Sequence, residues 1–211
     1  ILPGETDTLD ASFYLGPFGE GTYSATYALR RTDTTLATHS TTIQIPEPLP
    51  VNQVLPLRVS FIDVGQGDSV YIKTPAGRDV LIDGGKRGMG DVVVNYLRNQ
   101  GVDDIELVIA THPDADHVGG LISVLGSFVV EEVWDPGFEK DTATYRDFVT
   151  AVKAEGCPFL HPHRGSAVDI DPYLVEEILN PPETLYSDSN DSSIVLKIEF
   201  GTISFLLSLI H

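Results

Sequence analysis

Basic residues, cysteine and long apolar runs are all scarce in this chain of 211 residues. The single cysteine, Cys157, cannot form an internal disulfide, which excludes a disulfide-stapled scaffold and leaves the redox compartment open. No apolar run approaches the roughly 20 residues that span a bilayer. Residues 1–5 also lack the basic and apolar regions of a signal peptide, so none is expected in this chain. We expect a soluble protein, and a secreted or cell-surface location stays open.

The shortage of basic side chains also restricts the partners. Lysine and arginine number 13 against 31 acidic residues, so the net charge is −18. Proteins that hold nucleic acid through its phosphates carry a basic face. The composition therefore disfavours an extended nucleic-acid surface or an anionic membrane, and it leaves the oligomeric state undetermined.

The sequence changes character near residue 50. Residues 22–29 and 41–45 alternate apolar residues with Thr, Ser and Gln, which is typical of antiparallel hairpins with one buried face. Three prolines within residues 46–50 then predict a stiff connector. We therefore expect residues 1–50 to form a β-rich segment similar to part of an immunoglobulin-like sandwich, followed by a second domain at residues 51–211.

The second region alternates between strand and helix patterns, which predicts a layered α/β domain with a mixed sheet. Strands are expected at residues 57–64, 69–74, 79–82, 105–110, 129–134, 193–200 and 202–209. Helices are expected at residues 90–99, 117–125 and 142–154. In the first helix, the apolar residues Val92, Val93, Tyr96 and Leu97 follow a helical spacing, and the helix is expected to stop at Gly101.

One short segment concentrates side chains that bind metals. Residues 111–120 (THPDADHVGG) follow an expected strand, where α/β sheets commonly bind ligands, and they contain His112, Asp114, Asp116 and His117. Asp63, Asp68 and Asp83 lie at the ends of other expected strands. Carboxylates this close together would raise one another's pKa values, and divalent cations remove that penalty. Mixed His and Asp ligands suit Zn²⁺ or Mn²⁺.

Five stretches of this chain resemble the metallo-β-lactamase-fold family, most closely its ComEC-like branch, the hydrolase domain of bacterial competence proteins. They are residues 61–69 (FIDVGQGDS), 80–85 (VLIDGG), 111–120, 133–137 (VWDPG) and 190–196 (NDSSIVL). The resemblance implies an αβ/βα sandwich that binds two divalent metal ions. Relatives carry a Thr-Gly-Asp-like turn where this chain has Ile210 and His211, so the resemblance also implies a sandwich truncated at its C-terminus.

The resemblance assigns roles to individual residues. His112 and Asp114 would ligate the first metal, and Asp116 and His117 the second. Asp83 would be the buried carboxylate that orients this loop, and Asp83 and Asp116 are the catalytic candidates. Asp68 would support the floor of the site, while Asn190 and Ser192 would face the metals and the substrate.

These assignments favour a metal-dependent phosphodiesterase or nuclease acting on a phosphodiester or a DNA end. Two alternatives remain open: a catalytically degenerate binding or surface module, and a lactone, β-lactam or thioester hydrolase. Several other residues receive structural interpretations. His161 and His163 are expected at the surface, Cys157 in the core, and Trp134 and Asp135 at the end of a strand.

Overall fold

The computed structural model describes residues 21–31, 34–45 and 54–208, and the chain divides into two compact units, Ile1–Leu49 and Pro50–His211. In the first unit, β1 (Gly21–Arg31) and β2 (Thr34–Ile45) form an antiparallel pair whose register shifts between Leu29 and Arg30. The expected proline connector, and the C-terminal positions 210 and 211, lie outside the described residues.

The second unit is built on a sheet of six strands, ordered β10-β9-β7-β5-β4-β3. The strands β3, β4 and β5 form an antiparallel meander, and β5, β7, β9 and β10 run parallel to one another. Because β5, β7, β9 and β10 run in the same direction, their carboxyl ends lie along one edge of the sheet. Their bounds are β3 Arg58–Phe61, β4 Val70–Lys73, β5 Asp79–Ile82, β7 Leu107–Ile109, β9 Val133–Trp134 and β10 Phe159–Leu160.

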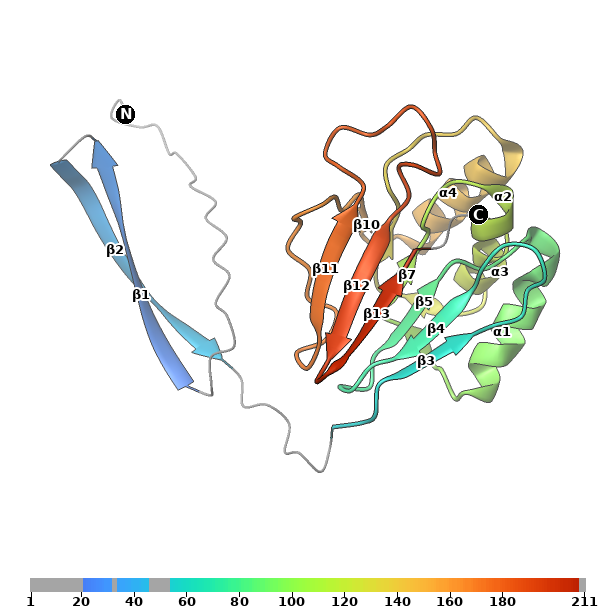
Figure 1. Cartoon of the computed structure of the whole chain (residues 1–211), viewed down its shortest axis with the longest axis horizontal. Helices are drawn as coiled ribbons and strands as arrows, with labels where there is room; N and C mark the ends of the chain where they lie inside the picture. Colours follow the sequence, from blue (N-terminus) through green and yellow to red (C-terminus); the bar gives the residue numbers. More distant parts are fainter. Residues whose placement is uncertain (1–20, 32–33, 46–53, 209–211) are drawn as a thin grey trace. The chain divides into compact units, whose positions relative to one another are not determined.

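A second, antiparallel sheet of β11 (Val175–Asn180), β12 (Val195–Phe200) and β13 (Ile203–Leu207) covers one face of the first. One apolar core lies between the two sheets, with Ile72, Val80 and Leu196 among its members. The other core lies between the six-stranded sheet and the helices (Figure 1). The described residues of the second unit therefore form one helical layer and two sheet layers, which agrees with the layered α/β fold class predicted from the sequence.

Two helices show how well local signals set boundaries. Helix α1 (Gly90–Asn99) has the predicted bounds, and Val93, Val94 and Leu97 form its buried stripe while Val92 is 41% exposed. Helix α4 (Ala143–Glu155) starts after Thr142, whose side chain accepts a hydrogen bond from the Tyr145 N–H.

Two predicted strands and one predicted helix are divided in the structure. Residues 105–110 and 129–134 each split, because β6 (Asp104–Ile105) and β8 (Val129–Val130) pair with each other instead of joining the main sheet. The helix expected at residues 117–125 becomes α2 (Ala115–Val118) and α3 (Leu121–Leu125). Here Gly120 packs so closely that an added Cβ would lie 1.9 Å from the Gly84 carbonyl oxygen.

Other elements are absent from the sequence prediction or shorter than expected. Strands β10 and β11 were not predicted, and a short 3-10 helix, Arg87–Met89, precedes α1. The strand predicted at residues 57–64 is longer than β3, which begins at Arg58 and ends at Phe61. The prediction therefore extends one residue too far at the start and three at the end. Within the described part of the chain, no helix combines the length and apolar character needed to cross a membrane.

Candidate metal centre

The candidate metal ligands lie at the carboxyl ends of two neighbouring parallel strands. Asp83 directly follows β5, and His112 lies three residues after the end of β7. The loop between β7 and α2 carries Asp114, and α2 itself carries Asp116 and His117. Strand pairing therefore brings residues about 30 positions apart in sequence to one point on the sheet edge.

Asp83 is the organising residue of this edge. It is fully buried and adopts a left-handed backbone conformation, with φ of 56°. Its Oδ1 accepts a hydrogen bond from the Thr111 N–H at 2.8 Å. Its Oδ2 accepts one from the Thr111 hydroxyl at 2.6 Å and pairs with Nδ1 of His117 at 2.8 Å. A strained conformation for a non-glycine residue persists only where the surrounding structure fixes it, as these contacts do.

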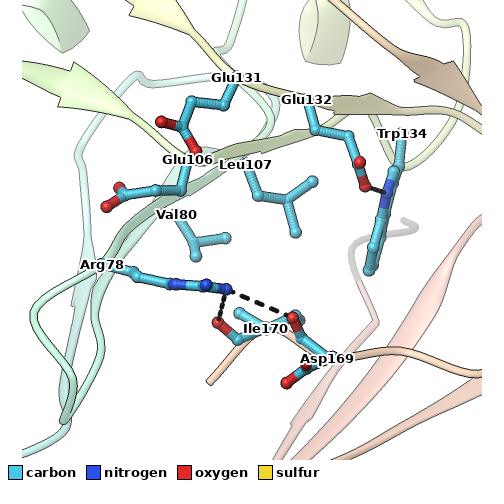
Figure 2. A pocket seen from close by; sticks show the side chains of 9 residues that line it. All are labelled: Arg78, Val80, Glu106, Leu107, Glu131, Glu132, Trp134, Asp169 and Ile170. Atoms are coloured by element: carbon cyan, nitrogen blue, oxygen red, sulfur yellow. Dashed lines mark hydrogen bonds between the residues drawn. The ribbon is translucent and has the colours of Figure 1, made fainter. Parts of the chain in front are cut away.

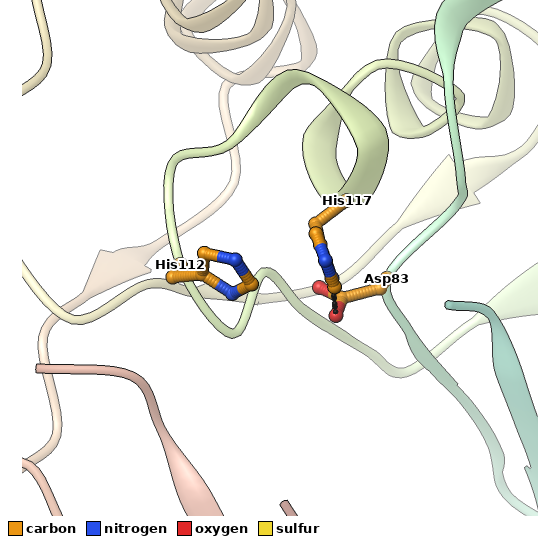
Figure 3. Close-up of side chains that lie close together, drawn as sticks. All are labelled: Asp83, His112 and His117. Carbon is orange, nitrogen blue, oxygen red and sulfur yellow. Dashed lines mark hydrogen bonds and ion pairs between the residues drawn. The ribbon is translucent and has the colours of Figure 1, made fainter. Parts of the chain in front are cut away.

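The same contacts determine which imidazole nitrogens of His112 and His117 are available to a metal ion. Because the Thr111 hydroxyl donates its one proton to Asp83, it accepts from Nδ1 of His112, which lies 3.0 Å away. This leaves Nε2 of His112 unprotonated. In His117, Nδ1 is engaged by Asp83, so Nε2 is the nitrogen suited to a metal. The two ring centroids lie 3.9 Å apart, and candidate ligand atoms of Asp83, His112 and His117 lie within 4.8 Å of one another (Figure 3).

Electrostatics distinguish the two imidazoles. Burial lowers the pKa of His112, and the charge of His117 lowers it further. Burial also acts to lower the pKa of His117, but the hydrogen bond and the charge of Asp83 outweigh it and raise the pKa above its ordinary value. The pKa of His112 thus lies below the ordinary imidazole value and that of His117 above it, so His112 is the imidazole that gives up its proton to a cation more readily.

Asp116 is held by the turn at residues 65–68. Gln66 donates from Nε2 to Asp116 Oδ2 at 3.0 Å, and Lys86 donates to Oε1 of the same glutamine. Gly67 passes so close to α2 that a Cβ there would lie 1.8 Å from the Asp116 carbonyl oxygen, and its φ is +88°. Asp68 accepts a hydrogen bond at its carbonyl from the Gly85 N–H at 2.9 Å. Asp68 thus lies in the turn beneath the cluster.

Asp114 lies at the other side of the cluster and has a cationic neighbour. Lys140 forms an ion pair with Asp114 Oδ1, and both side chains are about one-third exposed. The Ser189 hydroxyl lies 3.3 Å from the same oxygen and 3.4 Å from Lys140 Nζ. Neither Lys140 nor Ser189 was predicted, because each contact joins residues far apart in sequence and no local motif marks them.

Of the two residues expected to face the substrate, Ser192 is buried and Asn190 is half-buried. Ser192 is fully buried, and its hydroxyl accepts a hydrogen bond from the Tyr186 N–H at 3.0 Å, so it fixes its own loop. Asn190 is half-buried and lines a hollow of about 440 Å³ with Tyr186 and Asp191. This loop reaches the strand end through the Ile194 N–H, which donates to the Thr111 carbonyl at 2.8 Å. Ser189 is the side chain of this loop that contacts a candidate ligand.

Another cavity lies at the opposite end of the parallel strands. It measures about 220 Å³ and is lined by residues at the amino ends of β5, β7 and β9, with Arg78 and Trp134 on its walls (Figure 2). Its acidic side chains are Glu106, Glu131, Glu132 and Asp169. Arg78 donates to the Ile170 carbonyl at 2.9 Å. This cavity is separate from the His and Asp cluster at the carboxyl ends.

The donor set at the carboxyl ends fits a divalent cation. His112 and His117 are 3% and 2% exposed, and Nδ1 of each is occupied by a neighbouring oxygen. An outer carboxylate or hydroxyl that fixes Nδ1 is the arrangement typical of metal-binding histidines. The side chains whose candidate ligand atoms lie within 4.8 Å of one another are Asp83, His112 and His117, while Asp114 and Asp116 lie outside this group and contact Lys140 and Gln66, respectively. Mixed nitrogen and oxygen donors suit a borderline ion such as Zn²⁺ or Mn²⁺.

Comparison with known proteins agrees with this geometry. Residues 62–201 match the model of the metallo-β-lactamase superfamily. ComE operon protein 3 of Bacillus subtilis is 29% identical over 168 residues, which are 71% of this chain and 21% of that protein. Recombination protein 2 of Haemophilus influenzae is 28% identical over 156 residues, 72% of this chain and 18% of that protein.

This chain thus spans about a fifth of the length of the curated relatives it matches. Among solved structures, a metallo-β-lactamase variant from Cronobacter sakazakii is 16% identical and has a TM-score of 0.47, covering 67% of this chain and 55% of that one. The family match extends from the end of β3 to the turn after β12 and includes every predicted ligand. The chain belongs to the metallo-β-lactamase superfamily, as its motifs predicted.

Proposed function

We propose that this chain is a metal-dependent phosphodiesterase that holds two divalent ions, Zn²⁺ or Mn²⁺. His112 and Asp114 would hold one ion, and Asp116 and His117 the other. Bound ions would supply Lewis acidity toward a phosphoryl oxygen of the substrate. Asp83 contributes by holding Nδ1 of His117, and through Thr111 it sets the orientation of His112.

One observation supports an anionic substrate in particular. Lys140 contacts Asp114, and Lys86 reaches Asp116 through Gln66, so each of these two carboxylates is linked to an ammonium group. These lysines stand out in a chain whose net charge is −18. Positive charge around a cleft raises the local concentration of anions and offsets the repulsion from the rest of the surface.

The anion that we favour is a phosphodiester at a short or single-stranded DNA end. A strongly acidic protein repels a long duplex, whereas a strand end that enters the cluster meets local positive charge. The names of the two curated relatives, a ComE operon protein and a recombination protein, agree with a substrate of this kind.

A metal assay with a phosphodiester tests the proposal. After removal of metals with EDTA, we expect the chain to bind about two equivalents of Mn²⁺ or Zn²⁺ and to hydrolyse bis(p-nitrophenyl) phosphate. The double variant His112→Ala/His117→Ala should lose both properties. His163→Ala removes a histidine whose Nδ1 contacts the Arg164 carbonyl outside the cluster, so it should retain them. Absence of metal binding, or hydrolysis that survives the double variant, would overturn the proposal.

One contact favours a second candidate, a non-catalytic module. The Lys140 ammonium already pairs with Asp114 and so neutralises a carboxylate that a metal would otherwise neutralise. If that pairing is permanent, Lys140→Ala should increase metal affinity without producing hydrolysis. If the chain is an enzyme, the same variant should raise the KM for an anionic substrate, because it removes a positive charge beside the cluster. Parallel assays with nitrocefin and a lactone separate both candidates from carbonyl hydrolysis.

A further inference from the structure

A second pair of chemically active side chains lies on the same edge of the sheet as the cluster. Strands β5, β7, β9 and β10 are consecutive and parallel, so their carboxyl ends form one row. Asp83 and His112 follow the first two strands, and Asp135 and His161 directly follow the other two. The Asp135 N–H extends the ladder by donating to the Leu160 carbonyl at 3.0 Å. This row contains functional side chains beyond the metal cluster.

Asp135 fixes the His161 ring. The Asp135 side chain is 1% exposed, and its Oδ1 lies 2.6 Å from His161 Nδ1. The Tyr145 hydroxyl donates to its other oxygen at 2.6 Å, so both carboxylate oxygens are used. The ring of Phe159 meets the imidazole edge-on, with centroids 5.1 Å apart. His161 is therefore held through one nitrogen, while half of its side chain remains open to solvent.

The surroundings of His161 are unusually basic for this chain. A hollow of about 740 Å³ beside it is lined by Lys140, Arg146 and Lys153, against two carboxylates, Glu139 and Asp141. Arg146 pairs with Asp141 and Lys140 pairs with Asp114, so these charges offset one another and Lys153 is the cation of the hollow without a described carboxylate partner. The hydrogen bond with Asp135 is the main cause of a raised His161 pKa, which adds positive character to the hollow. By contrast, the cavity at the amino ends of the strands is strongly acidic.

Lys140 connects the hollow with the candidate metal centre, because it lines the hollow and also pairs with Asp114. Strands in a sheet lie about 4.8 Å apart, so the ends of β7 and β10, with β9 between them, are about 10 Å apart. A substrate held at the metal cluster by one phosphodiester would therefore place a neighbouring phosphoryl group on the His161 side of this hollow, and Lys153, in the last turn of α4, lines the same hollow.

We propose that this hollow binds a second phosphoryl group of the same substrate molecule, with Lys153 and His161 as binding residues and Asp135 as a positioning residue. The proposal rests on the phosphodiesterase function proposed above and narrows its substrate to chains with more than one phosphate. No described carboxylate forms an ion pair with Lys153, so its charge is available to an oxyanion. Imidazolium and ammonium donors are suited to charge-assisted hydrogen bonds with phosphate.

The first test uses metal-free protein, so it does not depend on hydrolysis. We would titrate the EDTA-treated chain with inorganic phosphate at constant ionic strength and follow the imidazole NMR signals. The signal that His161→Gln removes identifies His161. We expect this signal to move saturably, and Lys153→Ala to weaken phosphate binding about tenfold. Lys197→Ala is the matched control, because it removes one lysine from β12 outside the hollow.

Two outcomes of that titration would overturn the inference. One is a His161 signal that does not move with phosphate. The other is an equal movement when chloride replaces phosphate, which would indicate an effect of ionic strength alone. Equal losses in the Lys153→Ala and Lys197→Ala variants would also contradict the assignment, because they would reflect net charge and not the hollow.

A second test uses the Mn²⁺-loaded chain and separates substrate reach from the chemical step. We would compare kcat/KM for 5′-phosphorylated dithymidylate with that for bis(p-nitrophenyl) phosphate. Lys153→Ala should lower this ratio about tenfold, mainly through KM, and Lys153→Arg should restore it. If neither compound is hydrolysed, the proposed function fails, and the phosphate titration still decides whether the hollow binds phosphoryl groups. If both are hydrolysed and the ratio is unchanged, only this inference fails.

Discussion

Asp83 illustrates how one buried side chain determines the geometry of two others. Its two oxygens take hydrogen bonds from the Thr111 backbone, the Thr111 hydroxyl and His117. The motif predicted a buried carboxylate at this position. Thr111, which transmits the orientation to His112, lies in the other stretch, residues 111–120, and the sequence analysis did not single it out.

Replacing Asp83 tests this role. In Asp83→Asn, an amide nitrogen replaces one acceptor oxygen, so the contacts with Thr111 and His117 cannot all form. Loss of such an outer partner typically lowers metal affinity about 10- to 100-fold. We expect a loss of this size for Mn²⁺ by calorimetry. Asp103→Asn, at an exposed position, makes the same charge change and should stay within about twofold of the unmodified chain.

Glu176 provides a prediction for the pH dependence of stability. Burial raises its pKa to about 7, and the charges of Asp169 and Asp171 add to the rise, whereas the hydrogen bond from the Asp171 N–H lowers it. Between its ordinary pKa of 4.5 and 7, the folded chain therefore binds a proton that the unfolded chain releases. The free energy of unfolding accordingly falls as pH rises through this window.

Glu176→Gln should remove this dependence, because its amide oxygen can still accept from the Asp171 N–H. We expect the variant to match the unmodified chain near pH 4 and to exceed it above pH 7, by on the order of 1 kcal/mol after allowance for solvent screening. Urea unfolding at both pH values measures the difference. Glu177→Gln, on the adjacent exposed residue, controls for net charge, and a variant less stable than the unmodified chain at pH 8 would refute the prediction.

At the scale of elements, local patterns predicted the helices better than the strands. The bounds of α1 follow from its apolar spacing and from Gly101 shortly after its end. The split of residues 105–110 and 129–134 follows from the pairing of β6 with β8, which no local pattern encodes. Strand β10 has two residues and β11 carries adjacent glutamates, so neither gives a clear alternating signal.

The turn at residues 65–68 tests whether close packing positions α2. Gly65 and Gly67 both have positive φ, but an added Cβ meets nothing within 4 Å at Gly65 and would lie 1.8 Å from the Asp116 carbonyl oxygen at Gly67. Gly65→Ala should therefore cost only about 1–2 kcal/mol of backbone strain.

Gly67→Ala carries the same kind of backbone strain and must also displace α2. We expect a loss of more than about 3 kcal/mol in the free energy of unfolding, with weakened Mn²⁺ binding in the protein that remains folded. Urea unfolding measures both variants. Equal costs for the two alanine variants would show that the approach of this turn to Asp116 does not matter for stability.

At the scale of the whole molecule, the dominant property is the net charge of −18. Self-repulsion of this kind destabilises the compact state, and salt screens it. We expect the Tm to rise between about 0.05 M and 0.5 M NaCl, where the Debye length falls below about 10 Å. A Tm that is unchanged or lower at the higher concentration would contradict a destabilising role for this charge.

The sequence directed attention to residues 111–120 because potential ligands are concentrated within six residues after a strand, and the structure brings two of them, His112 and His117, together with Asp83. It did not reveal Lys140, Ser189 or the pairing of Asp135 with His161, since each depends on contacts across the fold. His161 was expected at the surface, and it is half-exposed; what the sequence could not show is the buried carboxylate beside it.

The most direct test of the central claim is an anomalous difference map from crystals of the metal-loaded chain, collected at the zinc or manganese absorption edge. We expect two peaks, one at coordination distance from Nε2 of His112 and one from Nε2 of His117, about 2.0–2.1 Å for zinc. Asp114 and Asp116 should complete the ligand set. A map without a peak at these side chains, with Lys140 still paired to Asp114, would contradict the account.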